Sequence, residues 1–316
     1  MSTAVAHPNI ALVKYWGKRD RELNLPSVGS LSVTLDRFET RTRVDFGVEV
    51  DTALINGRAV TGAAAARIFD HLDLVVPRRR PAQVVSENNF PTAAGLASSS
   101  SAFAALTVAA AADAGLDLTS RQLSALARRG SGSACRSLWG GFVEWRPGMA
   151  RDGSDSHGVP LAPPDHWDVA MVVVIVDSAK KSIGSRDAMI RTQTTSPMYK
   201  AWVTSYDRDL RQARQAVMDL DLEKLGTAME RSTWKMHSTA LTADPSIRYI
   251  RSTSLAVIEQ VEHMRSKGLG AWWTMDAGPN VKVLCEREDA ENVANRLRAL
   301  VPTVEVVGVG GPPTVE

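Results

Sequence analysis

The spacing of apolar and polar residues predicts short strands interleaved with longer helices. Short runs of apolar or alternating residues, bounded by glycine, proline or asparagine, are typical of strands. Such runs cover residues 9–16, 31–35, 40–50, 83–86, 169–176, 270–275, 281–285 and 303–309. A further run over 53–60 is divided by Asn56-Gly57, a dipeptide that favours a tight hairpin turn.

Segments with apolar residues three or four positions apart predict helices. These segments are 63–72, 102–112, 119–129, 199–237 with a break near 219–222, 247–266 and 288–300. In the predicted helix over 247–266, the residues expected to face the core are Leu255, Ile258, Val261 and Met264. The order of elements predicts a mixed α+β fold of two lobes with a cleft between them. Prolines between 160 and 164 place the boundary there, which gives an N-terminal lobe over 1–165 and a C-terminal lobe over 166–316.

Composition narrows the class of partner. The chain has 316 residues, 37 Lys and Arg against 35 Asp and Glu, and a net charge of +2. Such a balance gives no basic field for nucleic acid or a membrane surface, and we interpret the run 78–80 of three arginines as solvated surface. The apolar segment 96–115 contains four serines and Asp113, which favours a buried helix over a membrane span. We expect a soluble, cytoplasmic protein that binds a small molecule.

Cysteine usage agrees with a reduced compartment. Cys135 and Cys285 lie far apart, with no Cys-x-x-Cys pair and no histidine spacing suited to zinc. Cys135 is expected to be a small packing residue, because the sequence suggests no histidine partner for it. We therefore predict neither a disulfide framework nor a structural metal site.

A loop of small residues over 91–101 leads into the alanine-rich helix. Gly95 permits a sharp turn, and the serines from Ser98 onward are good helix N-caps. Free N–H groups and the helix dipole at such a start bind anions, so a nucleotide phosphate is one interpretation. An ordinary helix cap with a flexible lead-in is the other. The loop matches neither the Walker A pattern nor the dinucleotide Gly-x-Gly-x-x-Gly pattern.

Two further positions suggest chemistry. Asp276 follows a predicted strand and precedes the turn Gly278-Pro279, so its carboxylate is held in a rigid place, as a general base requires. Arg136 follows a second glycine-serine segment over 130–134, which is a possible second anion site. A guanidinium can hold a carboxylate through two parallel hydrogen bonds, although a structural ion pair is the alternative for Arg136.

Four blocks in the same order resemble one family. They are 9–20 (NIALVKYWGKRD), 86–99 (SENNFPTAAGLASS), 129–137 (RGSGSACRS) and 276–280 (DAGPN). Together they resemble the diphosphomevalonate decarboxylases of the GHMP kinase superfamily, and weaker matches near 180–189 and 307–312 extend the resemblance over nearly the whole chain. The chain departs from the usual family pattern at 28–30 (VGS) and at Gly184.

The resemblance implies a GHMP kinase fold, with an N-terminal lobe like ribosomal protein S5 domain 2, a C-terminal α/β sandwich and an active site in the cleft. The implied reaction is the ATP-dependent decarboxylation of mevalonate 5-diphosphate to isopentenyl diphosphate, with ATP and Mg²⁺ as cofactors. A homodimer is also implied. The ATP phosphates are expected to hold most of the Mg²⁺ coordination, and no metal ligand is assigned.

Site residues follow from the same resemblance. Catalysis is assigned to Asp276, Lys18, Arg136 and Ser98. Asp276 would accept or orient the proton of the C3 hydroxyl, Ser98 would stabilise the transferring phosphoryl group, and Arg136 would grip the C1 carboxylate. The substrate-binding residues are Asn9, Lys14, Tyr15, Lys18, Ser131, Ser133, Arg136, Ser185, Arg186 and Ala277. The ATP- and phosphate-binding residues are Ser86, Asn88, Ala94, Gly95, Leu96, Ala97, Ser98, Ser99 and Lys180.

Three alternatives stay open. The chain could act on mevalonate 5-phosphate, or it could be a mevalonate-type kinase that stops at phosphorylation. Lys18, Arg136 and Asp276 together argue against the kinase, because a reaction that retains its 3-phosphate does not need the same elimination geometry. An S5-like lobe could also belong to an RNA-binding or nucleotide-sensing protein, against which the near-neutral charge and the intact set of reactive residues argue.

Overall fold

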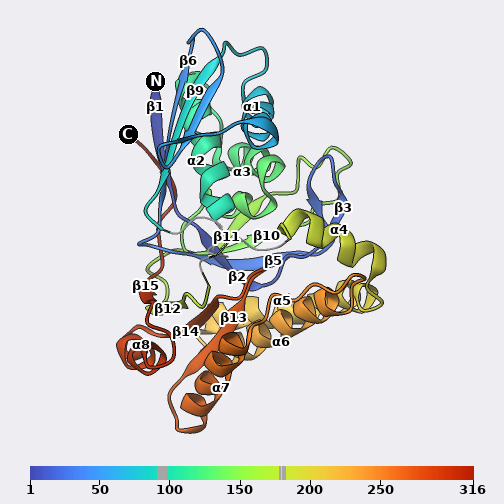
Figure 1. Ribbon diagram of the computed structural model, residues 1–316, viewed down its shortest axis with the longest axis vertical. Helices are drawn as coiled ribbons and strands as arrows, with labels where there is room; N and C mark the ends of the chain where they lie inside the picture. The colour runs from blue at the N-terminus through green and yellow to red at the C-terminus, as the bar shows by residue number, and fades with distance from the viewer. Residues whose placement is uncertain (91–97, 178, 180–182) are drawn as a thin grey trace.

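The computed structural model describes residues 1–90, 98–177, 179 and 183–316. It is an α+β structure of two lobes stacked along the long axis (Figure 1). The two-lobed organisation predicted from the sequence is confirmed. The predicted boundary at 165 lies between β11 and β12, and the exact division between the lobes stays a prediction.

A six-stranded sheet forms the far end of the N-terminal lobe. Its strands, in spatial order, are β16 (Thr314–Val315), β1 (Ser2–Ala6), β6 (Thr40–Phe46), β9 (Ala82–Asn88), β7 (Thr52–Ile55) and β8 (Arg58–Ala59). The helices of this lobe are α1 (Gly62–Val75), α2 (Ser98–Asp113) and α3 (Ser120–Gly130). Apolar residues of these helices and of the sheet form one core cluster. The alanine-rich α2 is buried along most of its length, as predicted.

A second sheet lies at the junction of the lobes. Its strands, in spatial order, are β11 (Gly158–Ala162), β10 (Phe142–Trp145), β5 (Ser30–Thr34) and β2 (Asn9–Val13). A short ribbon of β3 (Lys18–Asp20) and β4 (Leu25–Pro26) follows β2, and the one-turn helix η1 (Gly132–Cys135) follows α3. Side chains of β2 and β5 join a core cluster with α5, α6 and the third sheet. The hydrophobic core is therefore continuous across the junction.

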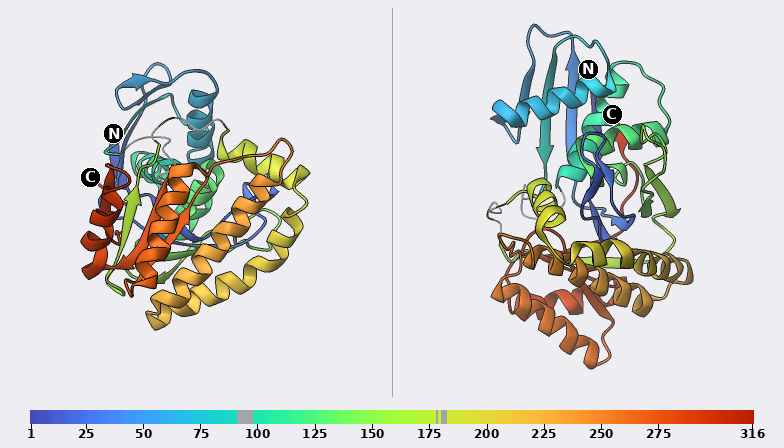
Figure 2. Two further views of the ribbon diagram at one scale, coloured as in Figure 1. Left: turned by 60° about the horizontal axis from the view of Figure 1, so that its bottom comes forward. Right: turned by 90° about the vertical axis from the view of Figure 1, so that its right-hand side faces the viewer.

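The C-terminal lobe has a four-stranded sheet between two helical layers. The strands are β13 (Ala271–Met275), β14 (Val281–Glu286), β12 (Val169–Val174) and β15 (Val304–Val307). The helices are α4 (Ser185–Thr195), α5 (Tyr199–Asp219), α6 (Leu222–Leu241), α7 (Ser252–Ser266), the short η2 (Arg287–Asp289) and α8 (Ala290–Arg298). One sheet face packs on α7 and α8, and the other packs on α5 and α6. Figure 2 shows the long helices α5 and α6 side by side.

Several boundaries differ from the sequence predictions. The strand predicted over 9–16 is β2, which ends at Val13, and the helix expected from 247 begins at Ser252. The chain turns after β2, and Gly17 has a positive φ of 90°. The hairpin turn at Asn56-Gly57 is confirmed, because both residues have positive φ and Ile55 pairs with Arg58.

The surface interpretation of the run 78–80 was wrong for Arg79. Its side chain is 5% exposed and pairs with Asp51 and Asp73 at 2.6 and 2.9 Å. The guanidinium also lies 5.7 Å from the centroid of the Phe69 ring. The two ion pairs of Arg79 therefore hold the loop that contains Asp51 against the end of α1, and the guanidinium is not solvated.

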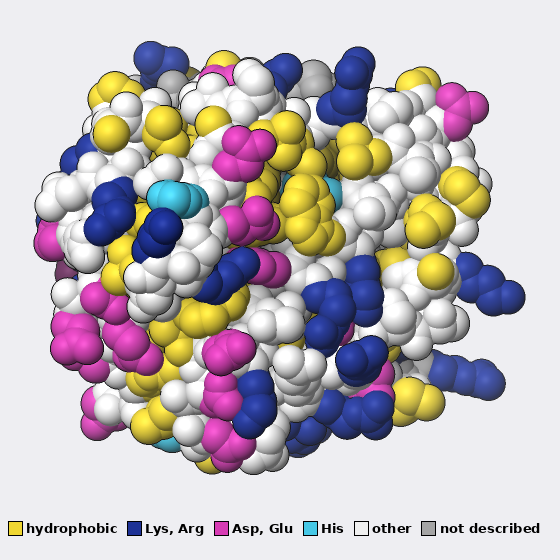
Figure 3. Space-filling model, turned by 90° about the horizontal axis from the view of Figure 1, so that it is seen from below, with side chains coloured by type: hydrophobic (Ala, Val, Ile, Leu, Met, Phe, Trp, Pro, Cys, Tyr) yellow, Lys and Arg dark blue, Asp and Glu magenta, His cyan; other side chains and the backbone are white. Residues whose placement is uncertain are grey.

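Acidic and basic side chains are interspersed with hydrophobic ones on the lower face of the molecule (Figure 3). This pattern agrees with the near-neutral net charge. Among the helices that the structure describes, none combines the length and the apolar character that crossing a bilayer would need.

Candidate active site

A cavity of about 390 Å³ lies between the lobes, and its lining comes from segments far apart in the sequence. Most of the predicted site residues lie there. Those lining it are Asn9, Lys14, Tyr15, Lys18, Ser98, Ser99, Ser131, Ser133, Arg136, Ser185, Arg186, Asp276 and Ala277. The fold therefore brings the blocks at 9–20, 129–137 and 276–280 to one place.

Asp276 is the carboxylate of this cavity, and two lysines hold it. It follows the last residue of β13, where the backbone turns and Gly278 N–H donates to the Asp276 carbonyl at 2.8 Å. Lys14 Nζ donates to Asp276 Oδ1 at 2.8 Å, and Lys282 Nζ lies 3.3 Å from Oδ2. Lys14 comes from the end of β2 and Lys282 from β14, so the carboxylate joins two sheets.

The two lysines decide the charge state of the carboxylate. Burial alone would raise the pKa of Asp276, but the positive charges of Lys14 and Lys282 outweigh it and hold the pKa well below its usual range. Burial lowers the pKa of Lys14 to about 8, although Asp276 acts in the opposite direction. Near neutral pH the carboxylate is therefore ionised and only weakly basic.

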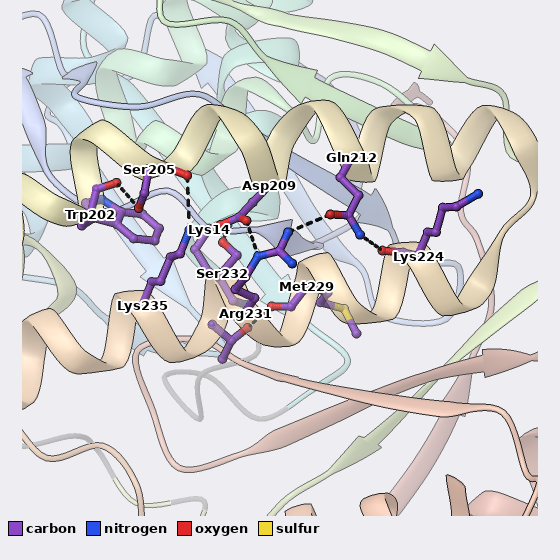
Figure 4. A network of polar contacts seen from close by, with 11 residues as sticks. Lys14, Trp202, Ser205, Asp209, Gln212, Lys224, Met229, Arg231, Ser232 and Lys235 are labelled. Carbon is purple, nitrogen blue, oxygen red and sulfur yellow. Dashed lines mark hydrogen bonds and ion pairs between the residues drawn. The ribbon is translucent and has the colours of Figure 1, made fainter.

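Helix α6 supports Lys14 from below. The backbone N–H of Lys14 donates to Ser232 Oγ at 3.0 Å. Next to Ser232, Arg231 Nε and Lys235 Nζ bond the fully buried Asp209 of α5 at 2.6 and 2.8 Å (Figure 4). The Ser232 hydroxyl thus holds the backbone from which the Lys14 side chain reaches Asp276, and the pairs with Asp209 join α6 to α5.

Arg136 is buried at the junction and held by neutral groups. Its Nε donates to Ser32 Oγ at 2.8 Å and to Asn9 Oδ1 at 3.1 Å, and its Nη1 donates to Ser30 Oγ at 2.6 Å. Asn9 is held in turn by Ser137 Oγ at 2.8 Å. No carboxylate in the described part of the chain pairs with Arg136, so the structural ion pair considered for this residue is absent there. Ser30 belongs to the triplet that departs from the family pattern, and here it holds the guanidinium.

A group of cations lines another part of the cavity. Burial, with repulsion from Arg186 and Arg67, lowers the pKa of Lys18 to about 8. Burial, with repulsion from Arg186, lowers the pKa of Arg67 to about 10. Among the described residues, no ion pair involves any of these three side chains. Lys18 is buried, so its charge is costly without an anion, and a phosphate group would supply one.

Tyr15 provides an unsatisfied polar atom at the same cavity. Its hydroxyl is buried and has no hydrogen-bond partner among the described residues. Its ring packs on Trp145 with 4.6 Å between ring centroids, and burial raises the pKa of the phenol. A buried hydroxyl is costly without a partner, so an oxygen-rich ligand would satisfy it.

The predicted phosphate-binding residues divide into three groups. Ser98 and Ser99 begin α2 and line the cavity, and Ser131 Oγ donates to Ser99 Oγ at 3.2 Å. Ser86 and Asn88 lie on β9 outside the cavity lining, where they bond the hydroxyls of Thr42 and Thr40 at 2.9 and 2.6 Å. The remaining predicted residues, Ala94, Gly95, Leu96, Ala97 and Lys180, lie outside the described residues.

Ser185 and Arg186 form the first turn of α4. Gly184, the second departure from the family pattern, is the residue before this helix and lines the cavity. Cys135 is buried, and burial raises its pKa to about 12, which confirms a packing role.

A larger depression of about 1140 Å³ lies along α5, α6 and β13, with Trp202, Trp234 and Trp272 in its walls. None of the predicted site residues that the structure describes lines it. Volume alone does not identify a site; the smaller cavity contains the ionised carboxylate and the cations, so we assign the chemistry to it.

Two family models cover this chain. The diphosphomevalonate decarboxylase-like N-terminal domain matches residues 6–158, and the mevalonate 5-diphosphate decarboxylase C-terminal domain matches residues 171–308. The chain belongs to the diphosphomevalonate decarboxylase family. Within this family, it is 37% identical to the enzyme of Gibberella zeae, over 98% of this chain and 86% of that protein. It is 36% identical to the enzyme of Candida albicans, over 94% of this chain and 87% of that protein.

Solved structures of family members have the same fold. Mevalonate diphosphate decarboxylase from Staphylococcus aureus superposes with a TM-score of 0.94 at 38% identity, over 100% of this chain and 97% of that one. A protein called MDDEF, in complex with MVAPP, AMPPCP and magnesium, superposes with a TM-score of 0.93 at 38% identity, over 100% of this chain and 98% of that one.

Sequence reasoning missed two charged residues at this family member's site, Lys282 and Arg67. Lys282 is the single charged residue in the apolar stretch VKVLC of β14. A lysine is rarely buried without a partner, so its place in an apolar strand could have marked it as a site residue. Arg67 is on α1, and it reaches the cavity because its guanidinium lies over the Phe103 ring, 4.5 Å from the centroid. No local pattern marks Arg67, since its position depends on how α1 packs on α2.

Proposed function

We propose that this protein catalyses the ATP-dependent decarboxylation of mevalonate 5-diphosphate to isopentenyl diphosphate, with release of ADP, phosphate and CO₂. The observation that carries the proposal is a single cavity with an ionised carboxylate, Asp276, held by two lysines, together with a buried guanidinium, Arg136, and a separate group of cations. A substrate with a carboxylate and a diphosphate has two anionic groups for these cations. The hydroxyl of a substrate bound in this way can then reach the carboxylate of Asp276.

Asp276 orients the C3 hydroxyl by accepting its hydrogen bond. The charges of Lys14 and Lys282 make the carboxylate too weak a base to remove an alcohol proton before phosphorylation begins. The hydroxyl becomes acidic only as its oxygen bonds to the phosphoryl group, and the proton moves to Asp276 at that stage. Because Lys14 and Lys282 hold the pKa of Asp276 well below its usual range, Asp276 passes this proton on to water and is ionised again. When the 3-phosphate leaves, the negative field of the ionised carboxylate stabilises the positive charge that develops at C3.

Arg136 and the cation group position the two ends of the substrate. Arg136, held by Asn9, Ser30 and Ser32, offers a fixed guanidinium plane to the C1 carboxylate. Lys18 and Arg186, with Arg67 beside them, bind the 5-diphosphate. Keeping the carboxylate end of the substrate fixed aligns the C1–C2 bond that breaks as CO₂ leaves.

The residues present fit ATP and magnesium. Ser98 and Ser99 bring hydroxyl groups and the start of α2 to the cavity, which suits phosphate oxygens. The described residues contain no cluster of three His, Cys, Asp or Glu side chains that could hold a metal ion. Mg²⁺ would therefore be held mainly by the phosphates of ATP, where it neutralises charge during phosphoryl transfer.

Two further properties of the protein complete the proposal. We propose a homodimer that works in the cytoplasm, without a nucleic-acid or membrane partner. The near-neutral charge and the two buried free cysteines support this setting. Sedimentation analysis of the purified protein would test the dimer, and a monomer at all concentrations would contradict it.

The substrate is tested by measuring CO₂ and ADP release with Mg-ATP on mevalonate, mevalonate 5-phosphate and mevalonate 5-diphosphate in parallel. We expect equal amounts of CO₂ and ADP from the diphosphate alone. Release of CO₂ from the monophosphate would assign the other decarboxylase reaction. Formation of ADP without CO₂ would identify a kinase.

A further inference from the structure

Lys282 is a charged residue in an otherwise apolar strand. It lies on β14, opposite Thr274 of β13 in the antiparallel register, and its side chain is 1% exposed. Its strand neighbours Val281 and Val283 belong to the core that packs on α7 and α8. Since side chains alternate along a strand, Lys282 points to the opposite face, toward Asp276.

Folding alone does not require a lysine at this position. Removing an ammonium group from water costs several kcal/mol, and well-packed apolar residues often replace a buried ion pair without loss of stability. Lys14 already gives Asp276 a close cationic partner at 2.8 Å. A second buried lysine, 3.3 Å from the other carboxylate oxygen, adds repulsion between two like charges. The excess positive charge points to a function in the site.

The described cavity lining includes Lys14 and Asp276 but not Lys282, which lies behind the carboxylate. Lys282 Nζ also lies 3.4 Å from the carbonyl oxygen of Asn280, so the turn after Asp276 holds the ammonium group in place. Lys282 attracts Oδ2 through its charge and not through an aligned hydrogen bond. With one positive charge at each oxygen, the plane of the carboxylate is fixed from both sides. Lys14 alone would leave the group free to rotate about its terminal torsion.

We propose that Lys282 is a positioning residue of this reaction: it fixes the Asp276 carboxylate in the plane in which the substrate hydroxyl meets it, and it places a second positive charge behind it. The proposal rests on the function proposed above and extends it to a residue that does not touch the substrate. Besides the two lysines, the charged and titratable groups facing Asp276 in the described part of the chain are Arg136 and His237. Burial lowers the pKa of His237 to about 4, so it is neutral where the enzyme is assayed.

The test compares Lys282→Met with Lys282→Arg and with Lys235→Met as the matched control. Lys235 is also a lysine bonded to a buried carboxylate, that of Asp209, but it lies away from the cavity. We expect Lys282→Met to lower kcat for CO₂ release on the order of 10- to 100-fold, with KM for both substrates nearly unchanged, because a misplaced catalytic group slows chemistry more than binding. We expect Lys282→Arg to recover part of the loss, and Lys235→Met to lower the melting temperature without this change in kcat.

A readout independent of turnover separates this proposal from the function on which it rests. The Lys14 side chain is followed by NMR titration of protein with ¹³C-labelled lysine, with its signal assigned from Lys14→Arg. Lys282 lowers the pKa of Lys14 by repulsion, so Lys282→Met should raise that pKa above about 8, whereas Lys235→Met should leave it unchanged. If Lys282→Met does not fold, Lys282→Gln is used for both measurements.

Wild-type activity on mevalonate 5-diphosphate tests the proposed function, and the Lys14 titration tests the placement of Lys282 whatever the substrate is. An unchanged kcat for the folded Lys282 variants, or an unchanged Lys14 pKa, would overturn the positioning role. An equal loss of kcat in Lys235→Met would also overturn it, because the loss would then be caused by lower stability of the fold.

Discussion

The charge on Asp276 is the residue-level feature on which the chemistry depends. Its carboxylate is ionised because Lys14 and Lys282 together outweigh the effect of burial. This favours a role in orienting the hydroxyl and in stabilising a cation over a role as a strong base. From the sequence, Asp276 at a strand end was expected either to accept or to orient the proton of the C3 hydroxyl.

Asp276→Asn tests this role, because the amide keeps the shape of the side chain and removes its charge. We expect kcat for CO₂ release to fall by about 10²–10³-fold or more, as when a preorganised electrostatic partner is lost. Calorimetric titration should find nucleotide binding largely kept. Full turnover in this variant would remove Asp276 from the mechanism.

The pH dependence of substrate binding follows from two lysines. Burial lowers the pKa values of Lys14 and Lys18 to about 8, so both are cationic below this pH and lose their charge above it. We expect KM for mevalonate 5-diphosphate to rise as pH increases through 8. Lys18→Arg should reduce the rise, because arginine keeps its charge in this range. A KM that is flat from pH 7 to 9.5 in the wild type would contradict the assignment.

Much of the site could be predicted from the sequence, because its residues lie in contiguous blocks. Asn9, Lys14 and Lys18 come from one block, and Asp276 heads another. Arg67 could not be predicted in this way, since its place at the cavity depends on packing over Phe103, which is far away in the sequence. Ser86 and Asn88 also belong to a matching block, but in the described structure they bond to β6 beyond the cavity lining, and their contact with ATP stays a prediction.

Element types were predictable where periodicity was strong, and boundaries were not. The predicted break near 219–222 is confirmed between α5 and α6. There Leu220 takes a left-handed conformation and Asp221 caps the next helix. The start of α4 at Ser185 was missed, since its first turn is as polar as a loop. Local polarity does not distinguish an exposed first turn from the loop before it.

Gly226 provides a test of how closely α6 approaches the sheet. A Cβ atom built at this position would lie 1.9 Å from the Trp272 ring on β13. Gly226→Ala improves helix propensity by about 1 kcal/mol, but overpacking at such a contact costs about 1–3 kcal/mol. We expect a lower midpoint of urea unfolding for this variant.

The matched control is Thr227→Ala, one residue further along α6. Thr227 is exposed, so its replacement tests the propensity of the helix without the contact with Trp272. We expect the midpoint to stay within experimental error or to rise slightly. If Gly226→Ala proved as stable as this control, the close approach of α6 to β13 would not hold in solution.

At the scale of the molecule, the site exists because the two lobes share a core and an ion pair. Lys14 of the junction sheet meets Asp276 of the C-terminal sheet, and the last strand, β16, returns to pair with β1 of the N-terminal lobe. The two lobes are therefore held at a fixed distance around the cavity. Two-lobe organisation was predictable from the order of elements, whereas the return of β16 was not, because a two-residue strand has no periodicity.

The central claim is that the C3 hydroxyl is first phosphorylated and then leaves as phosphate while CO₂ departs. We would follow mevalonate 5-diphosphate labelled with ¹⁸O at the C3 hydroxyl and analyse the inorganic phosphate by mass spectrometry after turnover with Mg-ATP. The account predicts one ¹⁸O atom in each phosphate formed, in equal amount to CO₂ and ADP. Phosphate without the label, with ¹⁸O found in water or retained in the product, would contradict it.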